Sequence, residues 1–240
     1  MHSQSHTIRL GDVSLNTHIT YNPAFDEPRP AVLIAPSFTG LRDRYIELTH
    51  MVAEWGYVGI AIDVYGDGAN SDNRDECMAL MQPFVDDRAM LRQRLQAHFA
   101  MTQDLDFVDP EQIAIMGFCF GGTCALDLAR CGAPLRGAVS IHGGFTIPTD
   151  LPCQIDPKTH LLILHGYKDA LCPPEGITDF AKECDSYGDI NWQWLFYGQD
   201  KHAFTDKVCS EMLPSECQYN EETTRHCWRS VKLFLEDVFD

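Results

Sequence analysis

The chain is short of basic residues and long apolar runs. Its 240 residues carry 18 Lys and Arg against 35 Asp and Glu, which gives a formal net charge of −17. A surface this acidic repels nucleic-acid phosphates and anionic lipids, so both are disfavoured as partners. No segment approaches the roughly 20 consecutive apolar residues that a membrane-spanning helix needs. The composition therefore predicts no nucleic-acid partner and no membrane association.

The ten cysteines include no Cys-x-x-Cys pair. The absence of that spacing argues against a zinc knuckle or a redox-active dithiol. The first residues, Met1 to His6, have neither the basic start nor the apolar stretch of a secretory signal. We therefore expect a cytoplasmic protein with reduced thiols, most of them buried as small apolar side chains.

What the chain does have is an alternation of strand-like and helix-like segments. With 45% apolar and 22% charged residues it can bury a large core, which excludes disorder and coiled coils. From residue 31 onward, short apolar runs alternate with segments of helical period, the pattern of a mostly parallel sheet flanked by helices. Eight strands are counted and no linker divides them. We expect an α/β fold in a single domain, residues 1–240.

The predicted elements are as follows. Strands are expected at 7–10, 13–21, 31–35, 57–62, 112–116, 137–141, 161–164 and 192–197. Helices are expected at 44–55, 75–101, 121–130 and 174–186 and at the C-terminus, and 206–220 is expected to be a long loop near the site.

The strongest chemical signal is the segment Gly117-Phe-Cys119-Phe-Gly121-Gly122. It lies between a predicted strand and a predicted helix, the context of a nucleophile elbow with Cys in place of Ser. So tight a turn requires glycine two residues to either side of the nucleophile. The N-terminus of the following helix favours a thiolate. The alternative is a plain glycine-rich turn that holds one more buried cysteine.

Two further residues follow strands in the order that this chemistry needs. Asp169 comes just after the strand at 161–164, and His202 just after the strand at 192–197. The carboxyl ends of parallel strands meet at one edge of a sheet, where open α/β folds place their sites. The order Cys, Asp, His is that of nucleophile, acid and base in α/β-hydrolases. His202 would hold the thiol proton and activate water, while Asp169 would orient the imidazole.

On these residues the sequence resembles the dienelactone hydrolase family of α/β-hydrolases. The G-x-C-x-G-G elbow, the His-Gly-x-x-Asp segment ending at Asp169 and the His-x-Phe segment starting at His202 all match. The resemblance covers almost the whole chain and implies an α/β-hydrolase fold without a cap domain. It implies a cysteine hydrolase of esters or lactones that works through a thioester. It also implies an oxyanion hole made of the backbone N–H groups of Phe38 and Phe120.

The chain departs from that family at two positions. Ser37 stands where dienelactone hydrolases have a glutamate that engages the thiol. Asp206 stands where they have an arginine that grips the substrate carboxylate, and an acidic group there would repel an anionic substrate. Arg88 matches a second such arginine only loosely and is not carried over. The departures favour neutral esters or lactones over dienelactones.

The remaining candidate pocket residues are mostly aromatic. Tyr65, Phe118, His142 and Phe204, together with Ser37 and Asp206, are expected near the cleft. His160 and His165 lie at opposite ends of one strand, while His18, His50, His98 and His226 look like surface positions. We therefore predict no metal and no cofactor, a small-molecule substrate, and a monomer or homodimer.

Two other functions remain open from the sequence. The same three residues could hydrolyse phosphotriesters such as aryl organophosphates, because a thiolate beside an oxyanion hole can also attack phosphorus. Alternatively, the fold could serve as a non-catalytic ligand-binding domain or a redox sensor.

Overall fold

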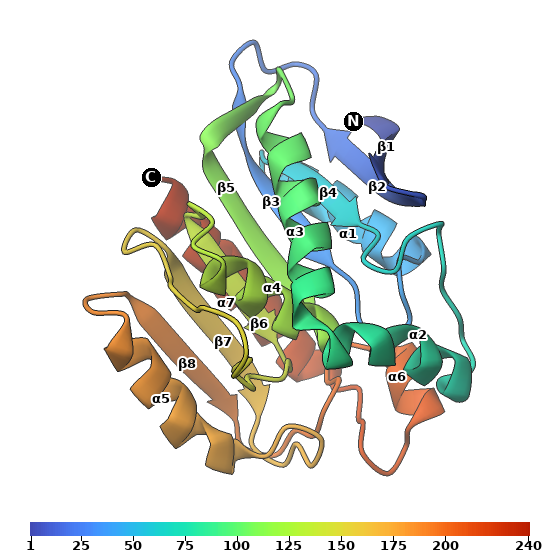
Figure 1. Cartoon of the computed structure of the whole chain (residues 1–240), viewed down its shortest axis with the longest axis vertical. Coiled ribbons are helices and arrows are strands. Elements are labelled where there is room, and N and C mark those ends of the chain that lie inside the picture. Colours follow the sequence, from blue (N-terminus) through green and yellow to red (C-terminus); the bar gives the residue numbers. More distant parts are fainter.

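The computed structural model, which describes residues 1–240, contains one eight-stranded sheet in the order β1-β2-β4-β3-β5-β6-β7-β8 (Figure 1). β1 pairs antiparallel with β2, and β2 antiparallel with β4, while the remaining neighbours pair in parallel. The eight predicted strands and the flanking helices are thus confirmed. No helix of the structure is both long and apolar enough to cross a bilayer.

The elements have the following bounds. The strands are β1 (His2–Leu10), β2 (Val13–Tyr21), β3 (Arg29–Ala35), β4 (Val58–Ile62), β5 (Val108–Phe118), β6 (Gly137–Ile141), β7 (His160–Gly166) and β8 (Trp192–Tyr197). The helices are α1 (Asp43–Glu54), α2 (Arg74–Asp86), α3 (Arg88–Gln103), α4 (Phe120–Arg130), α5 (Ile177–Ser186), α6 (Lys207–Met212) and α7 (Glu221–Phe239).

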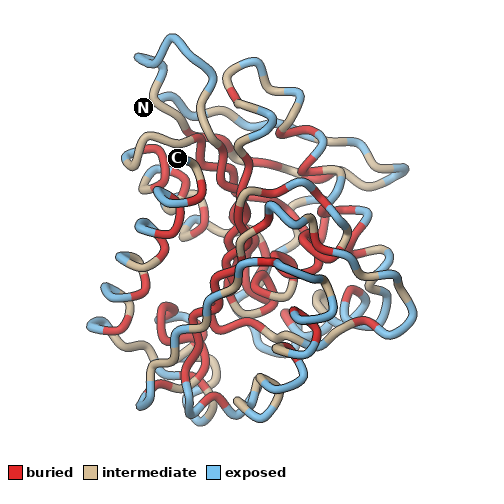
Figure 2. The backbone as a smooth tube through the Cα atoms, turned by 90° about the vertical axis from the view of Figure 1, so that its left-hand side faces the viewer, coloured by how far each residue is buried: buried red, intermediate tan, exposed pale blue.

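Helices cover both faces of the sheet. Residues of α2, α3, α4 and α5 pack with one set of strand side chains, and residues of α1 and α7 pack with the other set. Along β3, for example, Leu33 belongs to the first core and its neighbours Val32 and Ile34 to the second, as strand alternation requires. Seen edge-on in Figure 2, the buried strands form the middle layer between the two helical layers.

The structure corrects two of the predicted elements. The helix expected at 75–101 is two helices, α2 and α3, because the Asp87 carboxylate caps a new helix by accepting from Met90 N–H at 2.9 Å. The loop expected at 206–220 contains α6, and Asp206 caps it by accepting from Cys209 N–H at 3.1 Å. In both cases the missed feature is an aspartate N-cap: Asp87 lies inside the predicted helix and Asp206 inside the predicted loop.

His98, expected at the surface, is fully buried on α3. Its Nε2 lies 3.0 Å from the carbonyl oxygen of Asp63, and its Nδ1 lies 3.2 Å from the Thr17 hydroxyl. Burial lowers the pKa of His98 to about 4, although the bond to the Asp63 carbonyl opposes the shift. The imidazole is therefore neutral in the folded protein at pH 7.

This buried histidine makes folding stability depend on pH. The lowered pKa means that the unfolded chain binds a proton between pH 6.5 and about 4 while the folded chain does not. The contribution of His98 to the free energy of unfolding is therefore complete above pH 6.5 and falls at lower pH. The loss reaches about 2 kcal/mol at pH 5. Urea unfolding of wild type and His98→Asn at pH 7 and pH 5 should show a smaller pH-dependent loss in the variant. Equal losses would contradict this account.

Candidate active site

A cavity of about 580 Å³ opens at the carboxyl edge of the sheet. β3, β5, β7 and β8 all end at this edge, toward the lower part of Figure 1. Its lining includes Cys119 after β5, His202 after β8, and the predicted oxyanion residues Phe38 and Phe120. The topology thus brings these predicted residues to one cavity.

The turn around Cys119 has the geometry of a nucleophile elbow. Cys119 has φ 53° and ψ −115°, a conformation that non-glycine residues rarely adopt and that has to be held by its surroundings. A Cβ on Gly117 would lie 1.8 Å from the Gly121 carbonyl oxygen, and one on Gly121 would lie 2.2 Å from the Ala35 carbonyl oxygen. Both glycines are therefore sterically required. The turn places Cys119 at the N-terminus of α4, partly exposed to the cavity.

Asp169 holds the ring of His202. The His202 Nδ1 donates to Asp169 Oδ2 at 2.7 Å, and both side chains are buried. Asp169 Oδ1 in turn accepts from the backbone N–H groups of Leu171 and Cys172, each at 2.9 Å. These bonds fix the carboxylate and leave His202 Nε2, which is buried without a hydrogen-bond partner, on the opposite side of the ring.

The charge on His202 depends on its neighbours. Burial disfavours the charged ring, but the negative charge of a Cys119 thiolate and the hydrogen bond to Asp169 outweigh it and raise the pKa of His202 well above its ordinary value. The protonated form of the His202 ring is therefore favoured.

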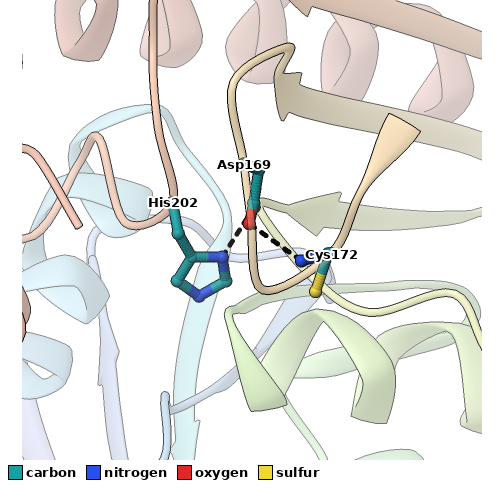
Figure 3. A group of neighbouring side chains, drawn as sticks. All are labelled: Asp169, Cys172 and His202. Carbon is teal, nitrogen blue, oxygen red and sulfur yellow. Dashed lines mark hydrogen bonds and ion pairs between the residues drawn. The ribbon is translucent and has the colours of Figure 1, made fainter. Parts of the chain in front are cut away.

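Sequence reasoning missed a second thiol at the site, Cys172. Cys172 lines the same cavity, and its Sγ, a carboxylate oxygen of Asp169 and a ring nitrogen of His202 lie within 4.8 Å of one another (Figure 3). Burial raises the pKa of Cys172, which favours the neutral thiol. Both carboxylate oxygens of Asp169 already accept hydrogen bonds from protein groups. The absence of a metal stays a prediction from the sequence.

Two tyrosine side chains form hydrogen bonds with the backbone of the loop that carries Phe38. The Tyr65 hydroxyl donates to the Phe38 carbonyl at 3.0 Å, and the Ser37 N–H donates to the Tyr45 hydroxyl at 2.8 Å. Tyr65 and Ser37 were expected at the pocket, but neither lines it. The Ser37 hydroxyl lies 3.0 Å from that of Thr39. These two residues thus position the loop and stay out of the cavity.

Three other pocket candidates also lie elsewhere. Phe118 and Phe204 are buried in the core on the α1 and α7 face of the sheet. Alternation along β5 turns Phe118 away from Cys119, and Phe204 lies in the turn after His202. Asp206 forms an ion pair with Arg44 and lies in a separate hollow beside α1. The sequence position of Asp206 had suggested that it faces the cavity, but the structure places it outside the cavity.

His142 contacts the backbone of Cys119. It follows β6, is fully buried, and its Nδ1 accepts from the Cys119 N–H at 3.2 Å. Its Nε2 lies 2.9 Å from the Thr205 hydroxyl. Burial, reinforced by the charge of His202, lowers the pKa of His142 well below its ordinary value, so the ring is neutral. Because Nδ1 accepts, Nε2 carries the proton and donates to Thr205.

We expect the substitution His142→Phe to lower kcat for ester hydrolysis about tenfold with little change in KM, because one hydrogen bond that holds the strained Cys119 is lost. The Cys119 N–H keeps its second acceptor, the Ile141 carbonyl at 3.0 Å, so the elbow still forms. His142→Gln, which retains a hydrogen-bond acceptor, should lower kcat by a smaller factor. Steady-state kinetics of the two variants measure this, and an unchanged kcat in His142→Phe would refute it.

The geometry agrees with what comparison with known proteins shows. The model of the dienelactone hydrolase family matches residues 18–239. A protein of Aquifex aeolicus named "Putative carboxymethylenebutenolidase" is 32% identical over 182 residues, which cover 74% of this chain and 78% of the relative. A Bradyrhizobium protein named "Probable 2-oxo-3-(5-oxofuran-2-ylidene)propanoate lactonase" is 29% identical over 218 residues, which cover 86% of this chain and 83% of the relative.

A solved structure extends the likeness to the whole fold. The dienelactone hydrolase-like promiscuous phosphotriesterase P91, from metagenomic libraries, superposes with a TM-score of 0.90 at 26% identity, over 99% of both chains. The match to the family model and this superposition both span nearly the full length. The chain therefore belongs to the dienelactone hydrolase family and is an α/β-hydrolase of the ester- and lactone-cleaving kind.

Proposed function

We propose that this protein hydrolyses neutral carboxylic esters or lactones with Cys119 as nucleophile, His202 as proton carrier and Asp169 as the group that orients His202. The observation that carries the proposal is a Cys119 on a strained elbow in the same cavity as a His202 whose Nδ1 is held by Asp169 at 2.7 Å. Family membership supplies the reaction class.

Each step uses groups already in place. The Cys119 thiolate attacks the carbonyl carbon, and the N–H groups of Phe38 and Phe120 stabilise the oxyanion that forms. The tetrahedral intermediate then collapses, and the leaving alkoxide takes the proton from His202. This leaves a thioester on Cys119. Neutral His202 next takes a proton from water through Nε2, and the hydroxide attacks the thioester. The carboxylic acid leaves as the Cys119 thiolate is expelled beside protonated His202, which restores the starting state.

The test is pre-steady-state hydrolysis of p-nitrophenyl esters. A covalent intermediate that breaks down more slowly than it forms should release a burst of p-nitrophenolate close to one equivalent per active site, followed by slower turnover. Turnover of these esters with no labelling of Cys119 at any time would overturn the role given to that residue.

Phosphotriester hydrolysis by the same residues is a second candidate, which the similarity to P91 favours. An aryl phosphotriester assayed beside the esters ranks the two substrate classes by kcat/KM. A non-catalytic binding or redox-sensing role predicts no turnover of either. A single domain over residues 1–240, a cytoplasmic location and the choice between monomer and homodimer stay predictions from the sequence.

A further inference from the structure

One arginine lines the cavity, and a buried carboxylate holds it. Arg88, the first residue of α3, is the only Lys or Arg among the lining residues. Its Nε donates to Asp127 Oδ2 at 2.6 Å, and its Nη2 lies 2.6 Å from Asp127 Oδ1. The Nε contact is a charge-assisted hydrogen bond, and the Nη2 contact is a second close ion-pair approach without hydrogen-bond geometry.

Asp127 has no other close partner of comparable quality. It is fully buried on α4, two helical turns after the nucleophile, and does not line the cavity. The Arg130 Nη1 donates to Asp127 Oδ1 at a longer 3.3 Å, while its Nε and Nη2 donate to Glu183 at 2.6 and 2.7 Å. Arg92 lies 4.0 Å away and donates to the Pro152 carbonyl at 2.7 Å. The charge of Asp127 is therefore directed chiefly at Arg88.

The rest of the lining suits an uncharged ligand. Twelve of its 21 residues are hydrophobic, among them Met78, Met81 and Val85 of α2. The carboxylates of Asp86 and Asp150 also belong to the lining. With Arg88 paired, no lysine or arginine in the cavity is free to bind a substrate carboxylate.

We propose that Asp127 is a specificity-determining residue: it cancels the charge of the only arginine in the cavity and so selects uncharged esters over anionic ones. The inference rests on the proposed hydrolase function and names its substrate class. It assigns that selectivity to Asp127, in place of Asp206, which lies outside the cavity.

The test compares two substrates that differ in one charge, neutral p-nitrophenyl pentanoate and the monoanionic p-nitrophenyl ester of glutaric acid, at pH 8. The measured quantity is the ratio of kcat/KM for the anionic ester to kcat/KM for the neutral one. The wild type should prefer the neutral ester at least tenfold. Equal or better turnover of the anionic ester by the wild type would overturn the proposal, and this arm needs no variant.

Asp127→Asn keeps the side-chain size and frees Arg88, so the ratio should rise about tenfold or more. In the double variant Arg88→Met, Asp127→Asn, where the pair is replaced by two uncharged groups, the ratio should return to the wild-type value. Arg130 keeps Glu183 in both variants, and thermal unfolding confirms that each is folded. An unchanged ratio in folded Asp127→Asn, or a gain that persists in the double variant, would refute the role of Asp127. The burst on the neutral ester reports separately on the Cys119 mechanism.

Discussion

Replacing Cys119 with alanine is expected to abolish the p-nitrophenolate burst and to lower kcat/KM for neutral esters by about 10⁴-fold or more. The reason is that alanine removes the only group that forms the covalent intermediate, while the cavity and the oxyanion donors remain. The side chain lies on the surface of the cavity, so the fold should survive. Stopped-flow absorbance on matched protein concentrations measures both quantities.

Two other cysteines serve as controls. Cys172 lines the same cavity beside His202 but is not on the elbow, so Cys172→Ser should keep the burst. Cys131, at the far end of α4, is partly exposed and lies outside the cavity, so Cys131→Ala should behave as wild type. If Cys172→Ser lost the burst and Cys119→Ala kept it, the assignment of the nucleophile would be reversed.

The second large effect is expected at Asp169. Asp169→Asn should lower kcat about 10⁴-fold, because an amide no longer holds the His202 tautomer with a proton on Nδ1 and no longer stabilises the charged ring. It should also lower the pKa of His202, since the hydrogen bond to Asp169 is one cause of its raised value. The pH dependence of kcat/KM and NMR titration of the imidazole measure the two effects.

The control for this charge change is Asp106→Asn, at an exposed position after α3. It removes one negative charge from a distant surface site and should leave kcat unchanged. A loss of less than tenfold in Asp169→Asn, with the protein folded, would mean that Asp169 does not orient the base. The proposed division of roles would then fail.

The sequence predicted the sheet well because its strands are apolar runs with clear ends. The strands at 137–141 and 192–197 have the predicted bounds. β1 is longer than expected because its additional residues, His2 to His6, are polar, although they pair with β2. β5 starts earlier than expected, at Val108, because the polar stretch Asp109 to Glu111 interrupts its apolar run. The N-cap Asp87 was missed because it lies within a long segment of helical period, and Asp206 because Asp is also common in loops.

The candidate site was predictable where a motif or topology constrained it. The glycines of the elbow identify Cys119, and strand ends identify Asp169 and His202. His142 was expected near the cleft, but its bond to the Cys119 N–H joins residues 23 positions apart. Asp127 contacts Arg88 39 positions away, and Cys172 belongs to no recognisable motif. Only the register of β5 with β6, which pairs Phe118 with Ile141, reveals that His142 lies next to Cys119.

The most direct test of the central claim is to identify the residue that carries the acyl group. Wild type is mixed with a p-nitrophenyl ester, quenched in acid during the burst, digested and examined by mass spectrometry. We predict one acyl group per chain, attached to Cys119 as a thioester and released by hydroxylamine. An acyl group on another residue, or a burst with no covalent adduct, would contradict the account.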